Sequence, residues 1–385
     1  MRVLNLTTHN EACGIAKYQE SFIDGLARRG HTEIESAIFD VSPNRIRPMG
    51  QAEYEETMRR FLDEARAFDI VHVQHEFGFF SRDELVRVVD GVHALGKRVV
   101  FTVHTSPSLI RPLYPPRLHG LGPRSWVRYA RELRHHRQLL KTVVAPLRKA
   151  DLLIVHNEAT KSALIELGVD PSHIVEIVHP LKAVVDTKPA NRIRSALGAG
   201  TDDVIMCTVG FLHKYKGIDA AIKALPFLPD HYKLAIIGGM NPTSDDVRFY
   251  DTIADLIRKL DLIDRVTITG YIEDDDELDA LIRECDVAVY PYNPVYYDQV
   301  SSGALNISLA NGMPTVAYPT RTFRELAAIT DAVTLTRSAN YYELARTVKE
   351  LELGWPNERA LKFAADYSYE RMSDELAAIY RRLAS

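Results

Sequence analysis

Cysteine and tryptophan are scarce in this chain of 385 residues, which contains three cysteines and two tryptophans. Cys13, Cys207 and Cys285 lie far apart in the sequence and form no pair with metal-ligand spacing. The sequence therefore predicts neither a disulfide scaffold nor a structural zinc site. We expect the three thiols to be small buried side chains in a reducing cytoplasm.

Long apolar runs, internal repeats and low-complexity segments are also absent. No stretch approaches the roughly 20 apolar residues that a membrane-spanning helix requires. Met1 leads almost directly into the strand-like segment VLNLT, so we expect no signal peptide. With 46% hydrophobic and 26% charged residues, the composition predicts a soluble, cytoplasmic globular protein with an ample core.

Apolar runs typical of buried strands alternate with amphipathic helical patterns, for example a helix over 14–29, and this alternation predicts parallel α/β architecture. A polar stretch at 183–200 predicts a linker with a short helix, after which the pattern restarts. We therefore expect two doubly wound, Rossmann-like domains, 1–182 and 183–366. The expected strands are 3–6, 70–74, 99–104, 152–156, 174–179, 204–210, 233–239, 266–271, 286–292 and 315–319.

The net charge of −5 conceals a strongly basic segment at 111–149, where ten Arg or Lys and three His accompany one acidic residue, Glu132. A helix is predicted from Pro123 onward, and along it Arg124, Arg128, Arg131 and His135 recur at helical spacing. This face is either merely solvated or a contact for an anionic acceptor, a membrane surface or a nucleic acid. We expect Arg128 and Arg131 to serve an acceptor.

The segment VGFLHKYKGIDAAIKAL (209–225) combines a strand, a glycine, a basic loop and a Lys-Gly pair that opens a helix. Lys216 adds positive charge where a helix N-terminus already favours an anion, so this loop predicts a phosphate site. A solvated basic turn is the alternative.

The stretch YDQVSSGALNISLANGMPTV (297–316) places a Gln-Val-Ser-Ser-Gly turn before a helix of small residues. Such a turn presents unpaired backbone N–H groups at the positive end of the helix, where a phosphate or a sugar can bind.

These two segments resemble the donor loops of retaining glycosyltransferases with the GT-B fold, in family 4 (group 1). The family carries G-R-x(4–5)-K-G in the first loop, and here Phe211 occupies the Arg position while Lys216-Gly217 matches. In the second loop most members carry two glutamates eight residues apart, and here the matching positions are Gln299 and Ile307. The resemblance covers essentially the whole chain. It implies the GT-B fold, with the two Rossmann-like domains facing a central cleft and the final helix (367–385) packing back on the first domain.

The resemblance also implies the roles of individual residues. Lys216, Gln299 and His104 would be the catalytic residues, with His104 at a position that contacts the donor sugar in relatives. His75 and Glu76, at another strand end, would lie on the acceptor side, because ligands bind beyond the carboxyl ends of parallel strands. The donor would contact Gly14, Gly210, His213, Lys214, Lys216, Gly239, Tyr271, Asp298, Gln299, Ser301, Ser302 and Gly303.

The acidic run Glu273–Glu277 could be mistaken for a metal site. Because it directly precedes an apolar helix, capping of that helix is the better interpretation, and no metal or cofactor is expected. The co-substrate implied is a nucleotide-diphosphate sugar, linked to UDP or GDP.

The predicted function is therefore metal-independent, retaining transfer of a hexose to a hydroxyl acceptor, with the protein cytoplasmic or peripheral at the inner membrane face. The acceptor could be a glycan, a glycolipid, a polymer, a protein or a nucleic acid. The alternatives are a GT-B sugar-nucleotide epimerase and a non-catalytic subunit that binds nucleotide sugars.

Overall fold

A computed structural model describes residues 1–10, 13–42, 49–76, 79–80, 83–104, 123–182, 188–240, 247–295, 297 and 301–385. The chain divides into two compact units, Met1–Val178 with Met372–Ser385, and His179–Arg371. Each unit contains one six-stranded sheet in which every neighbouring pair of strands is parallel. No helix among the described residues is both long enough and apolar enough to cross a membrane.

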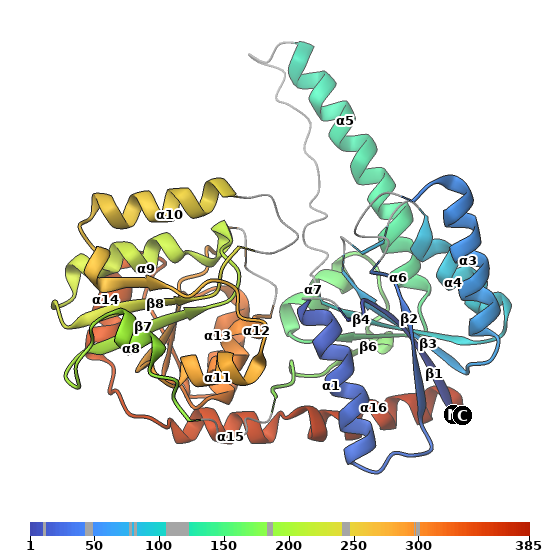
Figure 1. Ribbon diagram of the computed structural model, residues 1–385. Coiled ribbons are helices and arrows are strands. Elements are labelled where there is room, and N and C mark those ends of the chain that lie inside the picture. Colours follow the sequence, from blue (N-terminus) through green and yellow to red (C-terminus); the bar gives the residue numbers. More distant parts are fainter. Residues whose placement is uncertain are drawn as a thin grey trace. The chain divides into compact units, whose positions relative to one another are not determined.

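The sheet of unit 1 has the strand order β2-β1-β3-β4-β5-β6. Its strands are β1 (Arg2–Thr7), β2 (Glu35–Asp40), β3 (Ile70–His75), β4 (Arg98–Val103), β5 (Leu152–Val155) and β6 (Ile174–Glu176). The helices of this unit are α1 (Gly14–Arg28), α3 (Gln51–Ala65), α4 (Glu84–Ala94), α5 (Pro123–Leu139), α6 (Ala145–Lys149) and α7 (Glu158–Glu166), and most of α16 (Tyr369–Ala384) belongs to it (Figure 1).

The two faces of this sheet differ in chemistry, because successive side chains of a strand point to opposite faces. Leu4, Val71 and Phe101 lie on an apolar face and pack in one core with side chains of α3, α4 and α6. The alternate positions, which include His72 and Thr102, lie on the other face and are equally buried.

The sheet of unit 2 has the order β12-β11-β10-β7-β8-β9. Its strands are β7 (Val204–Val209), β8 (Tyr232–Ile237), β9 (Val266–Ile268), β10 (Val287–Tyr290), β11 (Thr315–Ala317) and β12 (Val333–Leu335). The helices are α8 (Arg192–Ala196), α9 (Ile218–Ala224), α10 (Val247–Lys259), α11 (Asp275–Ile282), α12 (Gly303–Ala310), α13 (Arg321–Ile329), α14 (Tyr341–Glu350) and α15 (Glu358–Asp366).

All ten predicted strands are present, and β2 and β12 are two further strands that the sequence did not reveal. Both lie at the edge of a sheet and are only partly buried, so neither forms a continuous apolar run. The acidic run caps α11 as predicted, since the Asp274 carboxylate accepts from the Glu277 backbone N–H at 2.7 Å.

Candidate functional site

In unit 2, the strand order reverses between β7 and β10, because the chain proceeds from β7 to β9 on one side and from β10 to β12 on the other. In open parallel sheets such a reversal opens a crevice at the carboxyl ends of the two strands, where ligands bind. The loops that leave these two ends contain Lys216 and Ser302, the centres of the two segments singled out above.

Lys216 is buried, although it lies in a short loop directly before α9. Its Nζ atom donates to the carbonyl oxygen of Val209 at 3.3 Å and lies 5.9 Å from the centroid of the Tyr292 ring. Burial lowers the pKa of Lys216 to about 8, because an ammonium group loses its hydration there. Among the described residues, no carboxylate lies within ion-pair distance of this nitrogen.

Two glycines make room for Lys216 and its loop. A Cβ atom on Gly210 would lie 2.3 Å from Lys216 Nζ and 3.7 Å from Ala304 Cβ, so Gly210 lets the ammonium approach the first turn of α12. Gly217 has a φ of +66°, and a Cβ there would lie 1.9 Å from the Pro291 carbonyl oxygen. The Lys216 loop is therefore packed directly against the chain that leaves β10.

Three tyrosines hold the start of α12. The Tyr290 hydroxyl donates to the carbonyl oxygen of Ala304 at 2.7 Å, and the Tyr292 hydroxyl lies 3.0 Å from Ser302 Oγ. Tyr297 donates to the carbonyl oxygen of Ser301 at 2.8 Å. Ser302 caps the helix, since its Oγ accepts from the Leu305 N–H at 3.2 Å, and Gly303 is the first helical residue.

Aromatic rings line the same group of loops. Tyr271 stacks on Phe211 with ring centroids 5.6 Å apart, and His213 stacks on Tyr215 at 5.5 Å. Tyr215 in turn stacks on Tyr297 at 4.9 Å, which ties the Lys216 loop to the loop before Ser301. Lys214, which lies between His213 and Tyr215 in the sequence, is exposed.

The two glycines that follow β8 bring these loops close together. A Cβ atom on Gly238 would lie 2.3 Å from the Gly210 carbonyl oxygen, and one on Gly239 would lie 2.6 Å from the Tyr271 nitrogen. The Gly239 carbonyl oxygen also accepts from the Leu212 N–H at 2.9 Å. The structure thus brings Gly210, His213, Lys216, Gly239, Tyr271, Ser302 and Gly303 together, while Asp298 and Gln299 lie outside the described residues.

Unit 1 has its own strand reversal, between β1 and β3. Gly14 is exposed at the first position of α1, which follows β1, and His75 ends β3 with Glu76 next to it. The His75 ring is fully buried and stacks on Phe80 with centroids 6.3 Å apart. Burial lowers the pKa of His75 to about 4, which keeps its imidazole neutral near pH 7.

His104 follows β4 and is joined to a buried polar chain that the sequence did not reveal. His104 Nε2 lies 2.8 Å from Gln74 Oε1, and Gln74 Nε2 lies 3.3 Å from His72 Nε2. His72 Nδ1 lies 2.6 Å from the Tyr380 hydroxyl of α16. The alternation of His72 and Gln74 along β3 indicated that both lie on one face of the sheet, but not that this face is buried.

From Pro123 onward the basic segment forms α5 and continues through a π-helical turn (Leu140–Val144) into α6, while residues 111–122 lie outside the described residues. Arg131 and Arg134 are exposed, as is Trp126, whereas the side chain of Arg128 lies outside the described positions. A cavity of about 570 Å³ runs along this helix, lined by Ala130, Leu133, Arg134, Arg137, Gln138, Lys141 and Thr142.

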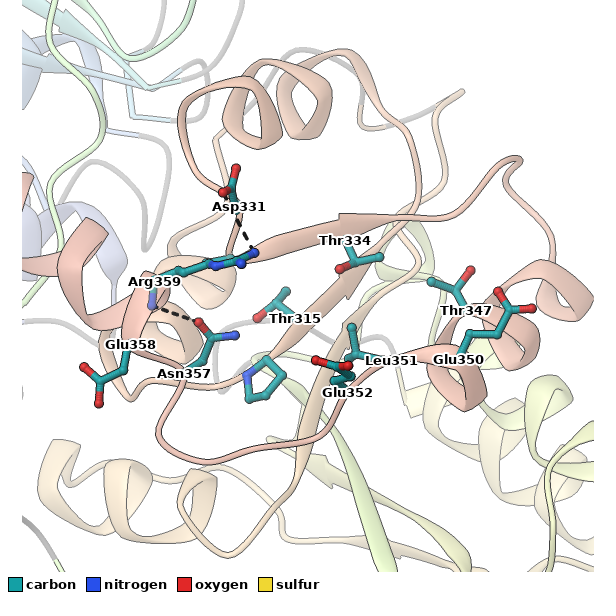
Figure 2. Close-up of a pocket in the computed structure, with 12 residues that line it drawn as sticks. Thr315, Asp331, Thr334, Thr347, Glu350, Leu351, Glu352, Asn357, Glu358 and Arg359 are labelled. Atoms are coloured by element: carbon teal, nitrogen blue, oxygen red, sulfur yellow. Dashed lines mark hydrogen bonds and ion pairs between the residues drawn. The ribbon is translucent and has the colours of Figure 1, made fainter.

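Unit 2 contains a cavity of about 580 Å³ that lies away from the loops of Lys216 and Ser302 (Figure 2). It surrounds the amino ends of β11 and β12, the sheet edge opposite Lys216, with Thr315, Asp331 and Arg359 among its lining residues. Asp331 pairs with Arg359 at 3.8 Å across it. Within the described part of the chain, no group of three or more His, Cys, Asp or Glu side chains could hold a metal ion.

Two family models match most of the chain. Residues 13–180 match the model described as Glycosyltransferase Family 4, and residues 189–366 match the model described as Glycosyl transferases group 1.

Among curated proteins, D-inositol 3-phosphate glycosyltransferases of Mycobacterium tuberculosis (strain H37Rv) and Mycobacterium bovis (strain AF2122/97) are 27% identical over 247 residues. That match covers 61% of this chain and 49% of the relatives, so it spans about half their length.

Solved structures match over nearly the whole chain. Anabaena HepE in complex with UDP and glucose has a TM-score of 0.72 at 16% identity and covers 99% of this chain and 100% of that one. Sucrose-phosphate synthase from Thermosynechococcus elongatus has a TM-score of 0.72 at 18% identity, covering 99% of this chain and 98% of that one. WaaG, a glycosyltransferase involved in lipopolysaccharide biosynthesis, has a TM-score of 0.64 at 16% identity, with 98% and 99% covered. The shared arrangement is the GT-B fold, which confirms the predicted fold class.

Proposed function

Because the chain belongs to the family 4, group 1 glycosyltransferases, we propose that it transfers a hexose from a nucleotide-diphosphate sugar to a hydroxyl acceptor, with retention and without a metal ion. The observation that carries this proposal is the buried ammonium group of Lys216 at the strand reversal of unit 2. A buried charge is costly unless a partner of opposite sign accompanies it. With no carboxylate of the described residues in ion-pair range, an anionic ligand is the partner that this site lacks.

A diphosphate suits the surroundings of Lys216. Gly210 lets the ammonium approach the first turn of α12, where free backbone N–H groups and the helix dipole favour negative charge. The largest charge that develops during sugar transfer is on the departing diphosphate, so Lys216 and the Ser302–Gly303 turn would stabilise the transition state. In the family this phosphate also accepts the proton of the attacking hydroxyl, so no separate base is required.

The remaining loops would hold the rest of the donor. The backbone near Gly239 and Tyr271 would surround the nucleotide base, and Ser301, Asp298 and Gln299 would contact the sugar from the second loop. Gly14 and His104 would contact the donor from unit 1. The HepE structures contain UDP and UDP-glucose, which makes a UDP-linked hexose the first donor to test.

We further propose an anionic acceptor, whether free or in a lipid surface. The basic face of α5 supports this, with Arg131 and Arg134 exposed, and the curated relatives are named for a phosphorylated acceptor. His75 and Glu76 would lie on the acceptor side of unit 1.

Thermal shift with UDP-, GDP-, ADP- and dTDP-linked sugars tests the donor. A selective ligand at 100 times its dissociation constant stabilises the folded protein by roughly 2.7 kcal/mol, which is readily measured. Slow hydrolysis of that donor without acceptor then distinguishes an enzyme from a non-catalytic binding subunit. A protein that no nucleotide sugar stabilises would contradict the proposal, and interconversion of the bound sugar without transfer would favour an epimerase.

A further inference from the structure

The buried polar chain beneath His104 in unit 1 carries an inference beyond the proposed function, on which it partly rests. This buried polar chain of hydrogen-bonded side chains lies on the face of the sheet opposite the apolar core, between strands β3 and β4 and helices α1 and α16. Its members are His72, Gln74, Thr102, Gln19 and Tyr380, and all five are at most 2% exposed.

The hydrogen bonds of this chain have directions that follow from chemistry. The Gln74 amide nitrogen can only donate. It donates to Gln19 Oε1 at 2.5 Å and faces His72 Nε2 at 3.3 Å, so His72 Nε2 must be the unprotonated nitrogen. Burial lowers the pKa of His72 to about 3, so the ring is neutral and its proton lies on Nδ1, facing the Tyr380 hydroxyl at 2.6 Å. The Thr102 hydroxyl also lies 2.8 Å from His72 Nε2 and donates to this unprotonated nitrogen.

The same argument determines the protonation of His104. With its amide nitrogen facing Gln19 and His72, Gln74 presents its carbonyl oxygen Oε1 to His104 Nε2 at 2.8 Å. A carbonyl oxygen can only accept, so His104 carries a proton on Nε2.

The ring of His104 is also held sterically. It meets the Tyr18 ring edge-on with centroids 4.7 Å apart, and the His156 ring lies 5.7 Å away. Its backbone N–H donates to the His75 carbonyl oxygen at 3.1 Å. The titratable groups seen to face His104 in the described structure are Tyr18 of α1, His156 after β5 and His75 of β3, and the neutral Gln74 bonds its Nε2.

We propose that Gln74 is a positioning residue that fixes the tautomer of His104, with the proton on Nε2 and Nδ1 as the hydrogen-bond acceptor. A sugar hydroxyl that binds this ring must therefore donate to Nδ1. The site should therefore favour ligands with a hydroxyl at that position over ligands whose group there can only accept a hydrogen bond. Tyr380 and Gln19 act one step further away, by holding His72 and the Gln74 amide in the orientation that this tautomer requires.

The first test reads the tautomer directly and needs no substrate. Two-dimensional ¹H–¹⁵N NMR of protein labelled at the histidine ring nitrogens distinguishes Nε2–H from Nδ1–H. We expect the Nε2–H form for His104, assigned by its loss in His104→Gln, and the Nδ1–H form for His72. The opposite tautomer at His104 would overturn the proposal, whatever the protein's activity.

The second test uses UDP-glucose hydrolysis and three variants. Gln74→Met removes the amide from a buried site at nearly constant volume, and we expect a mixed His104 tautomer and a rate about tenfold lower, the scale of one oriented hydrogen bond. Gln74→Glu keeps the oxygen that accepts from His104 but adds a charge, so the pH–rate profile should move to higher pH by about one unit. Gln19→Met is the graded comparison: it disturbs the same buried cluster without touching His104 and leaves His72 Nε2 to hold the Gln74 amide, so its rate loss and tautomer change should be smaller than those of Gln74→Met.

Equal rate losses in Gln74→Met and Gln19→Met, with the His104 tautomer unchanged and no shift of the profile in Gln74→Glu, would show that Gln74 is merely structural. If the wild-type protein neither binds nor hydrolyses any nucleotide sugar, the proposed function fails, and the sugar-binding role of Nδ1 fails with it. The tautomer measurement still decides whether Gln74 orients His104.

Discussion

Replacing Lys216 should stabilise the free protein while it destroys the proposed phosphate site. The pKa of this lysine falls from its ordinary value of 10.5 to about 8 on folding. Lowering a pKa by one corresponds to about 1.4 kcal/mol, so keeping the buried ammonium charged costs the folded state about 3 kcal/mol at pH 7. Lys216→Met removes this cost but loses a long hydrogen bond to Val209, worth about 1 kcal/mol, and the contact of the ammonium with the Tyr292 ring at 5.9 Å, worth about 0.5 kcal/mol. We therefore expect the free energy of unfolding to rise by about 2 kcal/mol.

The sign of the pH dependence follows from the same lowered pKa. Between about pH 8 and pH 10.5 the unfolded chain binds a proton at this lysine that the folded chain does not. The penalty is thus fully present below about pH 8 and disappears as the pH rises through 10.5, so this group makes the wild-type protein more stable over that window. The Lys216→Met protein should lack this rise.

Urea denaturation of unit 2 can be followed by a single reporter. The chain has two tryptophans, and Trp355 of unit 2 donates its indole N–H to the Asn311 carbonyl oxygen at 3.0 Å. A Trp126→Phe background leaves Trp355 as the only tryptophan. Lys214→Met is the matched control, because Lys214 lies in the same loop but is exposed, and its loss should leave the free energy of unfolding within about 0.5 kcal/mol.

Ligand binding supplies the second half of the test. UDP should bind Lys216→Met about 1.5–3 kcal/mol more weakly than it binds the wild type, while uridine binding should hardly change. The reasoning is refuted if Lys216→Met destabilises the free protein and UDP still raises its stability as much as in the wild type. Equal losses for UDP and uridine would remove Lys216 from the phosphate site.

Three further outcomes are expected. Sugar transfer should persist in excess EDTA, and its abolition with rescue by Mn²⁺ would contradict the metal-independent assignment. Replacing Arg131 and Arg134 with Glu should lower the ratio of sugar transfer to donor hydrolysis. The wild-type transfer rate should fall as salt is added, because exposed charges are screened within about 10 Å at 0.1 M ionic strength. A transfer rate that neither change affects would show that this face is merely solvated. Gly217→Ala should lower the unfolding midpoint of unit 2 sharply, because its Cβ would lie 1.9 Å from the Pro291 carbonyl oxygen. Gly303→Ala should not, because apart from its chain neighbours and its own helix no described residue has an atom within 4 Å of the new Cβ.

Much of the fold could be predicted because central parallel strands are buried on both faces and form continuous apolar runs. The edge strands β2 and β12 escaped because only part of each is buried. Glycine spacing and the Lys-Gly and Ser-Ser-Gly turns indicated the loops of the candidate site in unit 2. The tyrosines that hold α12 did not stand out, since a tyrosine in a strand gives no sign of what its hydroxyl will meet.

The polar chain beneath His104 could not have been predicted from local pattern. His72 and Gln74 alternate with valines along β3, a pattern equally typical of a strand with one face in water. Their face is buried only because α1 and α16 cover it, and the contact between His72 and Tyr380 joins residues 308 positions apart. The burial of Lys216 was equally hidden, because a lysine in a loop is normally exposed.

The membership of α16 in unit 1 has a consequence for how the protein is made. A ribosome synthesises β1 to β6 first, and then the whole of unit 2, before it releases the Tyr380 side chain that closes the polar face of the first sheet. Domains commonly fold in the order in which they emerge. Here the unit made first is finished last: a nascent chain stalled within unit 2 would already have α1 beside Gln74 but would lack the α16 side chain that covers His72. We expect the first unit to be less stable in such a chain than in the finished protein.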